Sequence, residues 1–405
     1  MMIDAMSMFS KGATITKLDF AHDETSQQRN GNRNTVLAIL LLAAALLFCG
    51  PSFALAEDNR PIPSHGYAAR DASGVLSPFE FERRPVGDND ILIEIKYSGI
   101  CHSDIHSVKS EWAEEIYPLV AGHEIVGTVA KVGKNVTKFK VGDNAGVGVM
   151  VDSCGECAYC RIGKEQFCEK GASFTYSGGL HGGYANNIVV TERFALHIPK
   201  SIPLPQAAPM LCAGVTTYSP LKAVGIKPGD KVAVAGLGGL GHMAVQYAKS
   251  FGADVTVFEI TDAKKDAALA LGASEYVNTR KNPEALHSYR GKFHVVVSTI
   301  PVKFEIQPYI DALRPMGTLI NLGLPPVGDN TSLVNLQTLV GGNKTLVGSL
   351  IGGIPETQEM LNYSAKHGIS AKVEIIPIQQ INEAIQNVLD GKVEFRYVID
   401  ASSIE

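Results

Sequence analysis

Seven cysteines carry the most chemical information in this 405-residue sequence, and four of them fall within fifteen consecutive residues. The four are Cys154, Cys157, Cys160 and Cys168, with the spacing C-x2-C-x2-C-x7-C. Gaps of two residues let successive thiolates converge on one ion, and four sulfurs leave no coordination position open, as is typical of structural zinc sites. An iron–sulfur cluster and a pair of disulfides are alternatives that the clustering favours less.

A second set of possible metal ligands is dispersed along the chain. Cys101 opens the segment CHSDIH, the pair His123-Glu124 follows about twenty residues later, and Cys212 lies in LCAG. Two cysteines and one histidine, with a fourth position left for water or substrate, would form a catalytic zinc site. Taken singly, a cysteine in an apolar segment is more often a small buried side chain, and a lone histidine is more often structural. Spacing alone does not unite residues so far apart.

A glycine-rich segment fits the pattern G-x-G-x-x-G, and its residues are Gly236, Leu237, Gly238, Gly239, Leu240 and Gly241. It follows an apolar run (231–235) that predicts a strand, and it precedes a predicted helix (242–251). This is the context in which the pattern indicates a dinucleotide site. The glycines allow close approach of the backbone to a pyrophosphate at the helix N-terminus.

Glu259 ends the next predicted strand (254–259), eighteen residues after Gly241. A carboxylate there can accept hydrogen bonds from both adenosine ribose hydroxyls and would repel a 2′-phosphate, which favours NAD. Lys264 and Lys265 could instead attract that phosphate, so NADP remains an alternative. Glu259 could also be an exposed acid at a strand end with no ligand.

The elements that carry these motifs are of two kinds. Residues 61–151 read as short alternating strands, such as 91–95 and 125–132, separated by glycine-rich turns, and they predict a β-rich domain. From about Pro205 strands alternate with helices, with later strands at 293–298 and 318–322. This alternation predicts an α/β fold with a parallel, doubly wound sheet.

The composition is that of a globular chain long enough for two domains, with 45% hydrophobic and 19% charged residues. It excludes a disordered, collagen-like or multi-span membrane protein. The formal charge of −5 comes without a basic block, so no nucleic-acid partner is expected.

Residues 1–56 stand apart because they contain the apolar run VLAILLLAAALLFC (36–49), preceded by Arg33. The run is shorter than the about 20 residues of a membrane span, and an A-x-A pattern (54–56) follows it, so we predict a signal peptide. An uncleaved anchor that contacts the membrane, or a wrongly assigned start, are alternatives. A functional leader predicts an exported, periplasmic or membrane-associated protein; otherwise the protein is expected in the cytoplasm. Export conflicts with a thiolate zinc site and a nicotinamide cofactor.

Together the motifs resemble those of the zinc-dependent medium-chain alcohol dehydrogenases, specifically the cinnamyl-alcohol-dehydrogenase-like branch. The segments that carry the resemblance are GICHSDIH, GHEIVGTVAKVGKNV, MVDSCGECAYC, LCAGVTTYSPL and VAVAGLGGLGHMAVQYAK. It extends from about Ser64 to Asp400. It implies a GroES-like catalytic domain built from both chain ends (61–212 and 350–405), with a Rossmann domain (213–349) inserted between them.

The resemblance also implies a role for each residue around the metal. Cys101, His123 and Cys212 resemble the catalytic zinc ligands, and Glu124 resembles a carboxylate that can approach the metal. Asp104 matches a residue that lies beside the zinc site.

Four further residues resemble groups that handle the proton and the cofactor. Ser103 matches the hydroxyl that hydrogen-bonds the substrate oxygen, and His106 matches the outer end of its proton relay. His102 and Arg396 fall where the family contacts the cofactor phosphates.

The implied activity is reversible oxidation of a primary alcohol to an aldehyde, with hydride transfer to NAD(P), two zinc ions per chain and a homodimer formed by the Rossmann sheets. A zinc-independent reductase of conjugated carbonyls and a non-catalytic zinc- and nucleotide-binding redox sensor are alternatives. The branch usually has a small hydroxyl residue in place of Glu259 and usually prefers NADP. Phe174 stands where plant lignin enzymes often have Trp, and the loop 178–183 is short, so a cinnamyl substrate is not implied.

Overall fold

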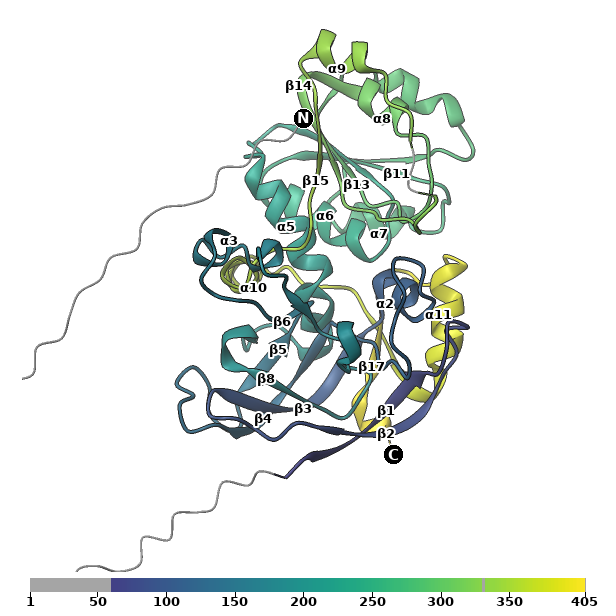
Figure 1. The fold of residues 1–405 in the computed structure, drawn as a ribbon. Helices are drawn as coiled ribbons and strands as arrows, with labels where there is room; N and C mark the ends of the chain where they lie inside the picture. The colour runs from purple at the N-terminus through teal and green to yellow at the C-terminus, as the bar shows by residue number, and fades with distance from the viewer. Residues whose placement is uncertain (1–59, 330–331, 405) are drawn as a thin grey trace, which may run out of the picture. The chain divides into compact units, whose positions relative to one another are not determined.

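The computed structural model describes residues 60–329 and 332–404 (Figure 1). The predicted signal peptide, residues 1–56, lies outside this part of the chain. Within residues 60–329 and 332–404, no helix combines the length and the apolar character needed to cross a membrane.

Six strands in the described part of the chain form one wholly parallel sheet in the order β12-β11-β10-β13-β14-β15. Numbered within the sheet this order is 3-2-1-4-5-6, that of a dinucleotide-binding fold. The predicted doubly wound sheet is therefore confirmed. Its strands are β10 (Lys231–Ala235), β11 (Asp254–Glu259), β12 (Glu275–Asn278), β13 (Phe293–Ser298), β14 (Leu313–Asn321) and β15 (Thr345–Gly348).

Strand β10 shows why this sheet is buried on both faces. Val232 and Val234 pack into one hydrophobic cluster, whereas Ala233 and Ala235 pack into another. Successive side chains of a strand point to opposite faces, so an unbroken apolar run such as VAVA has a covered layer on each side.

A second sheet combines strands from both chain ends. It has the order β16-β17-β3-β4-β5-β9, and β8 also pairs with β3. The C-terminal strand β17 runs antiparallel to β3, with Val398 opposite Gly99. The bounds are β3 (Asp90–Gly99), β4 (Ile125–Val132), β5 (Asn144–Val147), β8 (Asn187–Thr191), β9 (Ala195–His197), β16 (Glu374–Pro377) and β17 (Tyr397–Asp400).

Two antiparallel pairs and a set of helices complete the described fold. The pairs are β1 (Ile62–Ala69) with β2 (Leu76–Arg83), and β6 (Met150–Asp152) with β7 (Ser173–Phe174). The helices are α2 (His102–Val108), α3 (Ala158–Arg161), α4 (Leu204–Ala207), α5 (Ala213–Ala223), α6 (Gly239–Ser250), α7 (Lys265–Ala270), α8 (Gln307–Ala312), α9 (Leu336–Gly342), α10 (Ile354–His367) and α11 (Ile381–Leu389).

Candidate active site

Four candidate ligands that are far apart in the sequence meet in one buried cluster. The ligand atoms of Cys101, His123, Glu124 and Cys212 all lie within 4.8 Å of one another. Cys101 precedes α2, the pair His123-Glu124 leads into β4, and Cys212 precedes α5, so three separate elements converge. Every one of the four side chains is buried. The fold thus brings together the residues that spacing alone did not unite.

The donor set of this cluster fits a zinc ion. Two thiols and an imidazole are soft and borderline donors of the kind zinc prefers. His123 Nε2 is buried and has no hydrogen-bond partner among the residues that the structure describes. A hydrogen bond with Cys212 lowers the pKa of the Cys101 thiol well below its usual value; burial opposes this, and the charge of Arg396 supports it. A thiolate with an orphaned ring nitrogen nearby is suited to binding a metal.

Asp104 joins the ligand-bearing segments through its carboxylate. Its Oδ1 lies 2.8 Å from His123 Nδ1 and accepts the backbone N–H of Gly122 at 3.0 Å. Its Oδ2 accepts the backbone N–H of Cys101 and the hydroxyl of Tyr184, each at 2.9 Å. A carboxylate at Nδ1 fixes the tautomer with Nδ1 protonated, which leaves Nε2 free to bind a metal.

Ser103 and His106 lie on the short helix α2, directly after Cys101. Cys101 Sγ is 3.7 Å from Ser103 Oγ, so the hydroxyl borders the cluster. His106 is buried and its Nδ1 lies 2.5 Å from Glu111 Oε2. Its ring stacks on Trp112 with a centroid distance of 4.7 Å.

Arg396 connects the cluster to the glycine-rich turn. Its Nη2 lies 3.0 Å from Glu124 Oε1, and its Nη1 donates to the carbonyl of Ile100 at 3.1 Å. A Cβ at Gly239 would come within 2.6–2.9 Å of the guanidinium group. Burial raises the pKa of Glu124 to about 8, and the charge of Arg396 opposes that rise. The guanidinium therefore lies where it can contact both the acid and a group bound at the turn.

The glycine-rich turn has the geometry that its sequence predicts. Gly236 has φ +87, and a Cβ at Gly241 would lie 2.1 Å from the Gly236 carbonyl oxygen, so neither position accepts a side chain readily. Helix α6 begins at Gly239, three residues before the predicted start. His102, at the start of α2, is partly buried, and desolvation lowers its pKa to about 4.

Glu259 and Lys264 both form hydrogen bonds with the backbone of Leu237 inside this turn. Glu259 Oε2 accepts the Leu237 N–H at 2.6 Å, and its Oε1 accepts the Ile260 N–H at 2.7 Å. Lys264 Nζ donates to the Leu237 carbonyl at 3.2 Å. The acid therefore lies at the end of β11 against the turn, and the lysine is held beside it.

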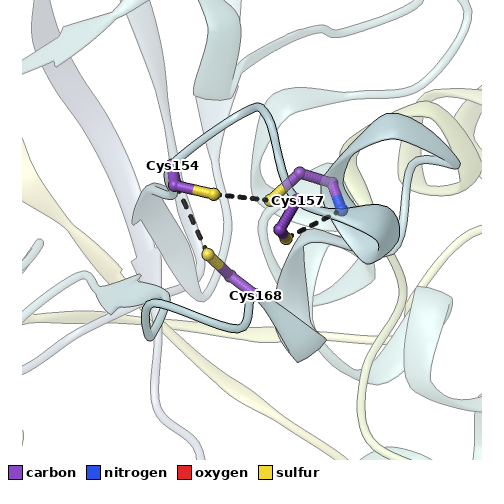
Figure 2. A group of neighbouring side chains, drawn as sticks. Cys154, Cys157 and Cys168 are labelled. Atoms are coloured by element: carbon purple, nitrogen blue, oxygen red, sulfur yellow. Dashed lines mark hydrogen bonds between the residues drawn. The ribbon is translucent and has the colours of Figure 1, made fainter. Parts of the chain in front are cut away.

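The four clustered cysteines also converge, with their ligand atoms within 4.8 Å of one another. All four are free thiols in the described chain, and Figure 2 shows three of them turned toward one another. Cys154 Sγ and Cys160 Sγ are 3.9 Å apart. Zinc–sulfur bonds of about 2.3 Å in a tetrahedron require about 3.8 Å between sulfurs, so the spacing fits one enclosed ion.

Family models match two regions of the chain. Residues 87–200 match the alcohol dehydrogenase GroES-like domain, and residues 239–366 match the zinc-binding dehydrogenase model. A probable formaldehyde dehydrogenase from Bacillus subtilis is 47% identical over 80% of this chain and 93% of its own length. The NADP-dependent alcohol dehydrogenase C 1 of Mycolicibacterium smegmatis is 47% identical over 84% of this chain and 98% of its own.

Solved structures give the same result. The cinnamyl alcohol dehydrogenase of Helicobacter pylori, complexed with NADP(H), has a TM-score of 0.81 and 43% identity, and the match covers 85% of this chain and all of that one. The chain belongs to the zinc-dependent medium-chain alcohol dehydrogenases. Within that family it falls in the cinnamyl-alcohol-dehydrogenase-like branch. The predicted combination of a GroES-like domain and a Rossmann domain is confirmed.

This dehydrogenase interconverts alcohols and aldehydes by hydride transfer to or from NAD(P). The zinc-independent reductase and the redox sensor are therefore set aside. The comparisons do not support the predicted signal peptide or export, and the family models begin only at residue 87.

The sequence reasoning missed several side chains of this dehydrogenase that contact the predicted site, among them Tyr176, whose hydroxyl lies 3.2 Å from His123 Nδ1. Glu111 pairs with His106, Trp112 stacks on the same ring, and Tyr184 bonds to Asp104. Glu111 and Trp112 follow His106 by five and six residues, so an acid and an aromatic soon after that histidine were an available signal. Tyr184 lies eighty residues from Asp104, and no local pattern marks it.

Proposed function

We propose that Cys101, His123 and Cys212 hold a catalytic zinc ion in this alcohol dehydrogenase. The observation that carries the proposal is the convergence of these ligand atoms, with Glu124, within 4.8 Å. When bound, the ion supplies Lewis-acid polarisation of the substrate oxygen. Glu124 is paired with Arg396 at 3.0 Å, which supports a role as an occasional rather than a permanent ligand.

The residues of helix α2 would handle the proton released from the alcohol. Ser103 borders Cys101, which supports its role as the group that hydrogen-bonds the substrate oxygen and accepts its proton. His106 lies one helical turn further on and would pass the proton outward, and Glu111 Oε2, 2.5 Å from its Nδ1, holds the ring in place. Arg396 and His102 would contact the cofactor phosphates near the glycine-rich turn.

The zinc proposal is tested with Cys101→Ala. This variant should lose turnover of aldehydes with NADH or NADPH, followed at 340 nm, because one of three protein ligands is removed. It should keep nucleotide binding, measured by fluorescence, because the glycine-rich turn is untouched. It should also hold one zinc ion fewer than the parent chain. Near-normal turnover would contradict the proposed role of zinc.

We infer that the second metal site, formed by the four clustered cysteines, holds a structural zinc ion. The 3.9 Å separation of two of its sulfurs supports an enclosed tetrahedral ion rather than an open catalytic one. Zinc analysis of the parent chain should give two ions per chain. One ion per chain would contradict this assignment.

We infer that the enzyme prefers NAD, although relatives are named for NADP and a solved neighbour carries NADP(H). The argument rests on Glu259, whose carboxylate lies at the end of β11 against the Leu237 peptide. A 2′-phosphate at this place would face a negative charge, and like charges in close contact are strongly unfavourable. Lys264 would weaken the repulsion but is bound to the Leu237 carbonyl.

Two variants of Glu259 separate its charge from its hydrogen bond. Glu259→Gln keeps an acceptor for the Leu237 N–H and removes the charge, and Glu259→Ser restores the small hydroxyl usual in the branch. Both should lower the ratio of kcat/KM for NAD to that for NADP by about 10-fold or more. Asp254→Ser, at the exposed opposite end of β11, is the matched control. An unchanged ratio in Glu259→Gln would refute the charge argument.

We infer a homodimer formed through the free edge of the Rossmann sheet. Strand β15 lies last in the sheet order, and all four of its residues are exposed. The neighbouring side chains Leu336 and Val340 of α9 are 70% and 81% exposed. Analytical ultracentrifugation should give twice the chain mass, and a monomer mass would contradict the inference.

We also infer the domain boundaries 61–212 with 350–405, and 213–349. The strands of the two large sheets fall inside these ranges, which supports the division. Limited proteolysis should cut near residue 349, where the chain is largely exposed, rather than near residue 212, where it is buried. Sequencing of the mature N-terminus tests the signal-peptide prediction, since a start near Glu57 would require cleavage of residues 1–56.

A further inference from the structure

Tyr184 is a fully buried tyrosine whose hydroxyl reaches toward the candidate metal cluster. Its exposure is 0%, and it donates to Asp104 Oδ2 at 2.9 Å. Burial raises the pKa of Tyr184 well above its ordinary value, which favours the protonated hydroxyl that can donate a hydrogen bond. The roles proposed above for groups that contact the substrate oxygen or the cofactor do not include Tyr184.

The carboxylate of Asp104 is the acceptor for four donors, each with a distance of 2.8–3.0 Å. They are the backbone N–H groups of Cys101 and Gly122, the ring Nδ1 of His123 and the hydroxyl of Tyr184. An ionised carboxylate has about four acceptor sites, so all of them are used. Three of the donors belong to the ligand-bearing segments. Tyr184 is the fourth, and it comes from a different part of the chain.

The backbone around Tyr184 is held in place beside the segment that carries His123. Tyr184 N–H donates to the Ala121 carbonyl at 2.9 Å, and Gly183 N–H donates to the Gly122 carbonyl at 2.8 Å. On its other side the Tyr184 carbonyl accepts the N–H of Tyr67 in β1 at 2.9 Å. The hydroxyl is therefore presented from a rigid backbone, which makes it an effective anchor for a carboxylate.

An alternative partner for His123 makes this anchor necessary. The hydroxyl of Tyr176 lies 3.2 Å from the same Nδ1 that Asp104 contacts at 2.8 Å. If the Asp104 carboxylate turned away, the ring could tilt toward this neutral hydroxyl. Nε2 would then leave the direction of the two thiols. A partner that fixes the carboxylate therefore also fixes the ring.

We propose that Tyr184 is a positioning residue of the catalytic metal site: its hydroxyl fixes Asp104, and Asp104 in turn holds the His123 ring with Nε2 directed at the ion. The inference rests on the proposed zinc site at Cys101, His123 and Cys212. It extends the chain of contacts behind the metal from a carboxylate and a histidine to a third, more distant group. Contacts of this kind behind a metal ligand typically change metal affinity by 10–100-fold.

The test is Tyr184→Phe, which removes one oxygen and keeps the ring. Zinc loss to a chelator is followed with a zinc-sensitive dye. Cys101→Ala should lack the catalytic ion, so the release phase that is absent from this variant is assigned to the catalytic site. Release of that ion from Tyr184→Phe should be roughly 10-fold faster than from the parent chain. Tyr247→Phe is the matched control, because Tyr247, on α6, is also fully buried and its hydroxyl is hydrogen-bonded to Ser364 Oγ, on α10, at 2.9 Å.

The control separates a metal effect from a general loss of stability. Both variants lose one buried hydroxyl, so similar thermal midpoints with faster zinc release in Tyr184→Phe alone support the proposal. Equal release from Tyr184→Phe and the parent chain overturns it. In the background of Asp104→Asn, the Tyr184→Phe change should add less than about 2-fold, because the path through the carboxylate is already broken; an independent 10-fold effect there would also overturn it. A parent chain without zinc would instead refute the proposed function.

Discussion

Glu165 offers a quantitative test of how the four-cysteine segment is joined to the rest of the enzyme. Its carboxylate lies in the 3₁₀ turn η1 (Glu165–Phe167), is 5% exposed and accepts the backbone N–H of Ile354 at 3.0 Å. Ile354 is the first residue of α10, whose N-terminal N–H groups have no partner within the helix. The contact is tight, since a Cβ at Gly353 would lie 1.8 Å from the Gly163 carbonyl oxygen.

The size of the effect of Glu165→Ala follows from these contacts. A hydrogen bond to a charged group contributes about 1.5–3 kcal/mol, and a negative charge at a helix N-terminus adds about 0.3–1 kcal/mol. We therefore expect Glu165→Ala to lower the free energy of unfolding by about 2–4 kcal/mol. Glu165→Gln keeps an acceptor and loses the charge, so it should cost about 1 kcal/mol.

The assay is urea unfolding of the full chain, with the zinc content of each variant measured in parallel. Glu169→Ala is the matched control, because this nearby acid is exposed. If Glu165→Ala and Glu169→Ala unfold at the same urea concentration, Glu165 does not join the cysteine segment to α10. If Glu165→Gln is as damaging as Glu165→Ala, the contribution of the acceptor has been overestimated and the charge dominates.

Two further predictions use a glycine and an ion pair in the catalytic domain. Gly122→Ala should be strongly destabilised and lose zinc readily, because φ at this position is +99 and a Cβ would lie 2.7 Å from Tyr184 Cδ1. Gly229→Ala is the control, because φ is +85 but the space around the position is open. In thermal unfolding it should show only the backbone cost of about 1 kcal/mol. Burial raises the pKa of Asp90, whereas the hydrogen bonds and the charge of Arg84 lower it. The lowering effects together are larger than the effect of burial, so the net shift is downward. The carboxylate therefore stabilises the fold above about pH 4 and ceases to do so as pH falls through its lowered pKa. Asp90→Asn should cost about 0.5–1 kcal/mol at pH 7, and urea midpoints that still differ from the parent at pH 2 would contradict this reading.

The strands of the Rossmann sheet could be predicted where the sequence pattern is local. β10, β11 and β13 have the predicted bounds because each is a short apolar run between turn residues. β14 begins at Leu313, five residues before the predicted start. The prediction left these residues out of the strand because Pro315 and Gly317 are typical of turns. The structure accommodates them with a register shift against β13, and Met316 adopts φ +63.

The same distinction explains which site residues the sequence reasoning found. The four clustered cysteines are marked by their own spacing, so no tertiary information was needed. Cys101, His123 and Cys212 were united only by the family resemblance, since 111 positions separate the first from the last. Tyr184 and Glu165 act through partners 80 and 189 positions away, and their roles depend on buried contacts that no periodicity or short motif encodes.

The position of Arg396 shows how the topology assembles the site. Arg396 immediately precedes β17, and β17 pairs with the end of β3, where Val398 lies opposite Gly99. β3 leads directly into Cys101, so the same pairing brings Arg396 beside the first proposed metal ligand and to within 3.0 Å of Glu124. The guanidinium also faces Gly239, in the glycine-rich turn that we propose binds the cofactor. The sheet that joins β17 to β3 therefore connects the proposed metal cluster to the glycine-rich turn through one buried charge, which a sheet made only from the N-terminal segment would lack.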